Sequence, residues 1–217
     1  MGKSLDRSDR KSERWMTMAL VALGQSKMVA RPVAGILHIL VYLGFIIINI
    51  EMLEIVIDGL TGSHRAFAGL GSLYTVLIAS FEVLALLVLV ACAIFLVRRH
   101  VIALARFKSP EMGGWPSLDA TIILIAEILL MSAFLTMNAA DAIAMAENLD
   151  HYEGIVVSES AFPISSIIAG LLDGVSDSNI VLIERFCWWF HIAGVLSFLV
   201  YVPYSKHFHI FLAFPNT

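Results

Sequence analysis

The sequence predicts an all-α integral membrane protein, a four-helix bundle that follows an N-terminal amphipathic interfacial helix. Three observations support this fold class. The 217 residues are 59% hydrophobic and 15% charged, and the mean hydropathy of +0.85 is typical of membrane proteins. Four apolar stretches are long enough to cross the hydrocarbon core, which takes roughly 20 helical residues. Basic residues are distributed unevenly among the segments that join these stretches.

The predicted spans are residues 33–57, 70–97, 118–140 and 186–204. Residues 1–32 should form a cytoplasmic tail and the interfacial helix, which is expected to end at Pro32, and residues 33–217 the transmembrane domain. A further apolar stretch, FPISSIIAGLLDG, is too short to cross and is interrupted by Pro163 and Gly170. We expect it to be an interfacial or re-entrant part of the third connection.

The charges of the connections predict the orientation. Seven basic residues precede position 32 and four lie within RRHVIALARFK, whereas the third connection, residues 146–180, is acidic. The positive-inside bias therefore places the N- and C-termini in the cytoplasm and the third connection outside, in an inner (cytoplasmic) membrane. The net charge of −4 gives no indication of a nucleic-acid partner.

Histidines mark the last span. His191 and His209 are 18 residues apart, so a continuous helix would project both from one face, about 27 Å apart along its axis. His207 would point to nearly the opposite side, and Pro203 is expected to bend the helix. Polar groups without partners are costly in lipid, so these imidazoles are expected to bind something.

His38 is the expected partner of His209. It lies near the cytoplasmic end of the first span, and two antiparallel helices bring these residues to similar depth. Two neutral imidazoles that face each other across a bundle can ligate the iron of one b-type haem. Either histidine alone would more simply be a hydrogen-bonded packing residue, but two at matching depth favour ligation. Five small residues near them were expected to admit a flat macrocycle: Gly35, Gly44, Ala193, Gly194 and Ser197.

The last 30 residues carry a recognisable pattern, H-x17-H with Pro-Tyr-Ser-Lys shortly before the second histidine. The matching residues are His191, Gly194, Pro203, Tyr204, Ser205, Lys206, His209 and Ile210. This pattern resembles the last helix of nitrate reductase gamma-subunit-like cytochromes b, a group that includes the membrane subunits of heterodisulfide-reductase-like iron–sulphur oxidoreductases. The resemblance implies that His38 and His209 are the inner-haem ligands. It also implies a cytoplasmic iron–sulphur protein, separate or fused as a C-terminal domain, as the electron-transfer partner.

The sequence departs from this family at the outer haem. Two-haem members carry a second histidine about three turns beyond the first, where this chain has isoleucine and asparagine at positions 48 and 49. The candidates to pair with His191 are His64 in the first outer loop and Met137 or Met145 in the third span. The alternative is that His191 hydrogen-bonds to a carboxylate or a quinone. We therefore expect one heme b. The residues leave open whether a second haem binds at His191.

Six acidic side chains fall within or near the spans: Glu51, Glu54, Asp58, Glu82, Glu127 and Asp141. The first three share one face of the first span near its outer end, and the last should lie at similar height. Oxidation of a quinol releases two protons with two electrons, and carboxyl groups can accept those protons. We predict that Glu51, Glu54, Asp58 and Asp141, with His64, line the quinol site or its proton exit. Hydrogen bonding between helices is the alternative for these four, and it is the expected role of Glu82 and Glu127.

Together these features predict a membrane cytochrome b that passes electrons between a quinol–quinone pool and a cytoplasmic iron–sulphur oxidoreductase partner. The chain would be the electron-transfer subunit or domain of a quinol-linked oxidoreductase. The two cysteines form no CxxC motif, so no iron–sulphur cluster is predicted within this chain. The alternative class is a haem-free proton or solute transporter, or an anchor subunit.

Overall fold

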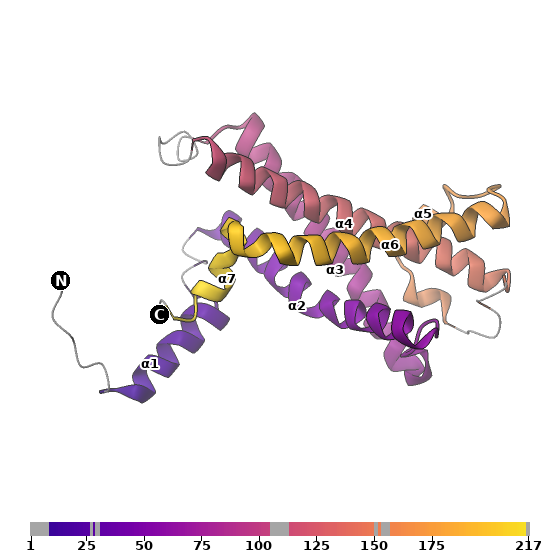
Figure 1. Cartoon of the computed structure of the whole chain (residues 1–217), viewed down its shortest axis with the longest axis horizontal. Helices are drawn as coiled ribbons and strands as arrows, with labels where there is room; N and C mark the ends of the chain where they lie inside the picture. The colour runs from indigo at the N-terminus through magenta and orange to yellow at the C-terminus, as the bar shows by residue number, and fades with distance from the viewer. Residues whose placement is uncertain are drawn as a thin grey trace.

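The computed structural model describes residues 9–26, 28, 31–104, 113–149, 152 and 157–215. Within these residues there are helices and no strand. Four helices are long and apolar enough to cross a membrane, which confirms the predicted fold class. They are α2 (Pro32–Thr61), α3 (Ser72–Leu96), α4 (Trp115–Ala146) and α6 (Asp177–Tyr201), all four labelled in Figure 1. Large apolar side chains remain exposed along all four, as expected of surfaces that face lipid.

Proline and glycine set the ends of these helices. Pro32 occupies the first turn of α2, where its missing N–H has no helical partner to lose. α2 ends at Thr61, and the next residue, Gly62, has a left-handed φ of 72° and donates its N–H to the Asp58 carbonyl at 2.8 Å. α4 begins after Gly114, which has a φ of 65°. The structure thus extends the first and third predicted spans at both ends and starts the last one nine residues earlier, whereas α3 begins two residues later than predicted.

The helices pack in the order α2–α3–α4–α6. Gly194 of α6 allows close contact with α4, because a Cβ atom there would lie 2.6 Å from Cδ2 of Leu130. Gly44 of α2 similarly faces the Val88 side chain of α3. Both glycines, which were expected to make room for a macrocycle, therefore permit the helices themselves to approach.

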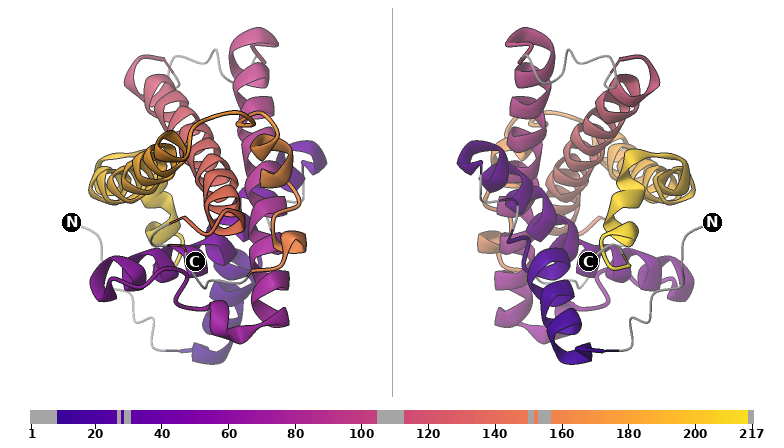
Figure 2. Two further views of the ribbon diagram at one scale, coloured as in Figure 1. Left: turned by 90° about the vertical axis from the view of Figure 1, so that its right-hand side faces the viewer. Right: turned by 90° about the vertical axis from the view of Figure 1, so that its left-hand side faces the viewer.

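The apolar part of the third connection packs on the bundle. It contains η8 (Glu159–Ala161) and the short helix α5 (Ser165–Ala169), which contact α3 and α4 respectively. Figure 2 shows this segment lying against the long helices. Ala161, Phe162 and Ser165 are buried.

The N-terminal helix is shorter than expected. α1 (Lys11–Met18) continues into a π-helical turn, η1 (Ala19–Leu23), and ends before Gly24. The expected end at Pro32 is wrong, because Pro32 begins α2 instead. No side chain of α1 is buried. η1 contacts α2 through the Tyr42 hydroxyl, which donates to the Leu23 carbonyl at 3.2 Å.

The last span does not continue to His209. α6 ends at Tyr201 and is followed by η9 (Val202–Tyr204), η10 (Lys206–Phe208) and α7 (His209–Leu212). Pro203 has no N–H to continue the helix, and Ser205 is extended with φ −113° and ψ 169°. The expectation that one straight helix projects His191 and His209 from one face is therefore wrong. Figure 1 shows α7 turning away from α6, at the same end of the molecule as α1 and opposite α5.

Candidate functional site

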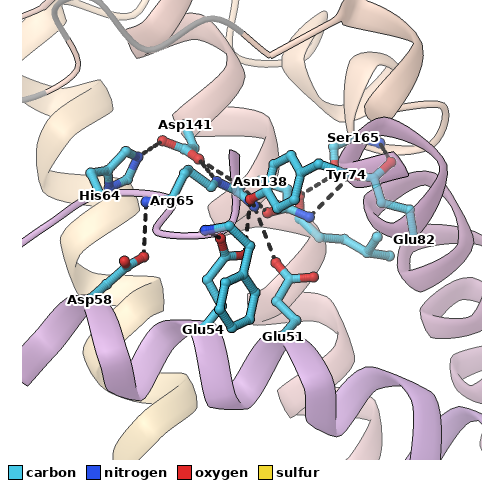
Figure 3. Close-up of polar contacts among 12 residues, drawn as sticks. Glu51, Glu54, Asp58, His64, Arg65, Tyr74, Glu82, Asn138, Asp141 and Ser165 are labelled. Atoms are coloured by element: carbon cyan, nitrogen blue, oxygen red, sulfur yellow. Dashed lines mark hydrogen bonds and ion pairs between the residues drawn. The ribbon is translucent and has the colours of Figure 1, made fainter. Parts of the chain in front are cut away.

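A buried polar cluster lies where α2 joins α3, and Arg65 is its centre (Figure 3). Arg65 Nη2 lies 2.6 Å from Oδ2 of Asp141 and donates to Oδ1 of Asn138 at 2.7 Å, both on α4. Its Nη1 donates to Glu51 of α2 and to the Tyr74 hydroxyl of α3, each at 3.3 Å. One guanidinium thus joins three of the four spans.

The acidic side chains of α2 also hold the backbone of this loop. Asp58 accepts from the N–H groups of Arg65 and Ala66 at 2.9 and 3.0 Å. Glu54 accepts from the Phe67 N–H at 2.8 Å and from the Tyr74 hydroxyl at 2.9 Å. The predicted gathering of Glu51, Glu54 and Asp58 beside Asp141 is therefore what the structure contains. Many of the contacts in this cluster are hydrogen bonds, which were the alternative role predicted for these carboxyl groups.

Glu82 extends the cluster toward the third connection. Its Oε1 accepts from Asn138 Nδ2 at 3.3 Å, and its Oε2 accepts from the N–H groups of Ile164 and Ser165 at 2.8 and 3.0 Å. This joins the second and third spans, as expected, and it also satisfies the start of α5. Glu127 is not part of this network but lines a cleft described below.

The cluster contains more acids than bases. Glu51, Glu54, Glu82 and Asp141 are each at most 2% exposed and Asp58 is 9% exposed, whereas the connected cations are one guanidinium and at most one imidazole. Burial lowers the pKa of Arg65, but Asp141 and other acidic neighbours raise it well above its ordinary value, so this residue stays charged. Several uncompensated charges would be very costly in a buried site, so some carboxyl groups must hold protons. One candidate to gain and release a proton is Glu51, whose Oε2 is buried without a hydrogen-bond partner.

His64 connects the cluster to the third connection. Its Nε2 lies 2.6 Å from Oδ1 of Asp141, and its ring packs edge-on against Tyr152 with centres 4.7 Å apart. The Tyr152 hydroxyl donates to Glu184 of α6 at 2.7 Å, and burial, with this bond, raises the pKa of Tyr152. His64 is therefore placed where a proton route was predicted. As a partner for His191 it is less well placed, because it does not line the cleft that holds that residue.

Arg65 was not among the predicted site residues. It is the only lysine or arginine between positions 32 and 97, and it directly follows the acidic end of the first span. A lone basic residue on the side predicted to be outside is an exception to the positive-inside bias. That exception could have identified Arg65 as a site residue.

His38 and His209 meet at the opposite end of the bundle. Their ring centres are 6.3 Å apart and their planes are inclined by 64°. Two imidazoles that share one iron hold their ring centres about 6 Å apart, because each metal–nitrogen bond is about 2 Å long. The two histidines were expected at matching depth on straight helices. The bend after Tyr201 is what brings them together.

The nitrogens of this pair suit a metal. Nδ1 of His38 is buried without a hydrogen-bond partner. Nδ1 of His209 lies 2.7 Å from the Lys206 carbonyl, to which it can donate and so leave Nε2 with a free lone pair. Burial, followed by the neighbouring His209, lowers the pKa of His207 to about 4, and its ring packs against Phe198. His207 is therefore a neutral neighbour of the pair.

His191 lines a small cleft of about 70 Å³ between α2, α4 and α6. Its Nδ1 donates to the Leu130 carbonyl at 3.2 Å, and the side chain is 3% exposed. The other polar side chains of the cleft are Asn49 and Glu127, and its two thioethers are those of Met52 and Met131. Met137 and Met145, proposed as partners of His191, are buried in the core and do not line it.

The cleft and the histidine pair follow the same helix faces. Val41, Phe45, Ile48 and Met52 of the cleft continue the row that begins at His38 on α2. On α6, His191 is followed by Val195 and Phe198, and Phe198 reaches His207. Among the described residues there is no group of three or more His, Cys, Asp or Glu side chains arranged to hold a metal ion. A haem held by the histidine pair requires only two such side chains.

Two curated proteins are similar to nearly the whole chain. It is 30% identical over 210 residues to a protein of Bacillus subtilis described as probable iron-sulfur-binding oxidoreductase FadF, a match that covers 97% of this chain and 27% of that protein. It is 22% identical over 218 residues to the EtfAB:quinone oxidoreductase of Syntrophomonas wolfei, with 98% and 28% covered. The chain thus spans about a quarter of the length of the curated relatives that it matches.

No family model and no solved structure matches the chain. One relative is named for iron–sulphur binding, in agreement with the expected relation to iron–sulphur oxidoreductases, and the other is named for a quinone. The finer resemblance to nitrate reductase gamma subunits stays a prediction. The chain is thus similar to about a quarter of two longer proteins named as oxidoreductases, and it has four helices long and apolar enough to cross a membrane.

Proposed function

We propose that this chain is the membrane electron-transfer module of a quinone-linked iron–sulphur oxidoreductase. The observation that carries the proposal is the His38–His209 pair, whose 6.3 Å separation suits two ligands of one iron. The names of the two relatives support the same reaction class.

The proposed cofactor is one heme b, which supplies a one-electron carrier when bound. His38 and His209 would ligate its iron. The Lys206 carbonyl orients the second imidazole by accepting from Nδ1. A second haem at His191 has less support, because the partners proposed for that residue lie outside its cleft.

The cleft at His191 is the proposed site of the quinone ring. Its lining is mostly apolar with a few polar groups, which is usual for sites that bind small molecules. His191 can offer Nε2 to a quinol hydroxyl, because its Nδ1–H is used by Leu130. The cleft shares a helix face with His38, so electrons have a short route to the histidine pair.

The Arg65 cluster is the proposed acceptor of protons from the quinol. Glu51 immediately precedes Met52 of the cleft, and one of its oxygens has no partner. Glu51, Glu54, Asp58 and Asp141 would store protons, and His64 beside Asp141 would pass them to the surface. With the positive-inside orientation, protons leave outside and the histidine pair lies near the cytoplasm.

The proposed partner is an iron–sulphur protein on the cytoplasmic side, separate or fused. The relatives are almost four times as long as the match, so they contain further sequence in which such a domain could reside. Half-buried basic residues after α3, such as Arg98 and Arg99, are suited to the inner leaflet or to this partner. Arg106 and Lys108, also considered for this role, lie outside the described residues.

Absorption spectroscopy tests the proposal. Protein purified from membranes should show a Soret band and low-spin b-type α bands that sharpen on reduction by dithionite, and a menaquinol analogue should reduce the same species. A folded, colourless protein would leave the haem-free transporter or anchor class in its place.

A further inference from the structure

Asp119 of α4 holds the segment that carries His209. Its carboxylate is 1% exposed. Oδ1 accepts from the Tyr201 hydroxyl at 2.5 Å, and Oδ2 accepts from the Lys206 backbone N–H at 2.8 Å. One side chain therefore joins α4 both to the last turn of α6 and to the turn beyond the bend.

The hydrogen bond between Asp119 and the Lys206 backbone acts on His209 through Lys206 alone. The Lys206 carbonyl lies 2.7 Å from Nδ1 of His209. An imidazole that donates its Nδ1–H to a carbonyl presents the lone pair of Nε2, and the same bond sets the direction of the ring. Fixing Lys206 therefore fixes both the tautomer and the direction of His209.

This external support matters because α6 has already ended. Ser205 is extended, and the bonds from the His207 N–H to Ser205 Oγ and from the Phe208 N–H to the Ser205 carbonyl are local. Local bonds shape a turn but do not place it relative to α2, where His38 resides. Asp119 ties the turn to a long, packed helix of the bundle.

We propose that Asp119 is a positioning residue for the haem ligand His209, which it orients through the Lys206 backbone. The inference rests on the proposed function, because it gives His209 its role as a ligand. The Tyr201 contact is secondary, since it leads to α6 and not to the histidine.

Five variants of the chain, purified from membranes, separate these contacts. Asp119→Ala removes both bonds, whereas Asp119→Asn keeps an acceptor for Lys206 and Tyr201→Phe removes only the tyrosine contact. Lys206→Pro removes the N–H donor, and it fits because Ser205 is extended and proline suits the first position of a helical turn. It tests the same bond if Asp119→Ala fails to fold, with Lys206→Ala as the control for loss of the side chain.

Two readouts are needed. Electron paramagnetic resonance should show that Asp119→Ala and Lys206→Pro lose the low-spin bis-imidazole signal, while Asp119→Asn, Tyr201→Phe and Lys206→Ala keep it. Hydrogen exchange of peptides over residues 202–212, measured in protein produced without haem, should be about tenfold faster at the Lys206 amide in Asp119→Ala than in Asp119→Asn.

The failures of the two proposals are distinguishable. A wild-type protein that binds no haem contradicts the proposed function. Wild-type exchange in Asp119→Ala, or a wild-type low-spin signal in both Asp119→Ala and Lys206→Pro, contradicts the positioning role. Loss of that signal in Tyr201→Phe to the same extent as in Asp119→Ala also contradicts it, because the effect would then run through α6.

Discussion

Arg65 and Asp141 form an ion pair, with 2.6 Å between Nη2 and Oδ2, that joins the α2–α3 connection to α4. Both side chains are at most 5% exposed, so removal of the cation leaves buried carboxylates without their main partner. Arg65→Gln should lower the free energy of unfolding by about 3–5 kcal/mol, measured by denaturation in detergent.

Arg185→Gln is the matched control for that variant. Arg185 pairs with Glu184 at 3.3 Å but its side chain is 39% exposed, so its loss should cost about 1 kcal/mol or less. Equal effects of the two substitutions would show that Arg65 does not organise the cluster.

Glu51→Gln tests the proposed proton acceptor. Glutamine keeps an oxygen for the bond from Arg65 but cannot take up a proton. We expect quinol-dependent reduction to slow by about 100-fold while the haem spectrum stays unchanged. Stopped-flow spectroscopy measures the rate, and Glu159→Gln at an exposed position serves as the control. A normal rate would remove Glu51 from the proposal, and the same comparison applies to Glu54→Gln.

Gly194→Ala tests the contact between α6 and α4. The added methyl group would lie 2.6 Å from Leu130 Cδ2, and Leu130 lines the cleft and binds His191 through its carbonyl. We expect a loss of about 1–3 kcal/mol in stability and a raised KM for quinol. Gly69→Ala is the control, because no atom lies within 4 Å of its added Cβ. Indistinguishable stability and KM in the two variants would contradict this account of the packing.

The proposed orientation can be tested by labelling cysteines. Cys92 and Cys187 are buried, so the background should be low. Glu159→Cys in the third connection should react with a membrane-impermeant maleimide in intact cells, whereas Glu13→Cys in α1 should react only after the membrane is opened. The opposite pattern would reverse the orientation and the direction of proton release.

The spans could be predicted because membrane thickness sets a minimum apolar length, and that constraint acts on each helix separately. The acidic face of α2 was likewise readable, because Glu51, Glu54 and Asp58 are related by helical spacing alone. Their partner Arg65 was not found, because it lies in an irregular connection whose path depends on contacts with α3 and α4.

The proximity of His38 and His209 was predicted, but the helix geometry expected to produce it was wrong. Their proximity was expected from antiparallel helices of equal depth, but α6 stops at Tyr201 and the chain bends before His209. Pro203 signalled the bend, whereas its direction depends on Asp119, which is distant in the sequence. Contacts between distant residues of this kind cannot be read from helical periodicity.

The most direct test of the central claim is the haem content of the wild type and of histidine variants, measured as pyridine haemochrome per chain. His207→Leu is the control for His209→Leu, because His207 lies in the same turn and packs against Phe198. The account predicts about one haem per chain in the wild type and in His207→Leu. It predicts loss of low-spin haem in His38→Leu and His209→Leu. Full low-spin haem in either of these two variants would contradict it.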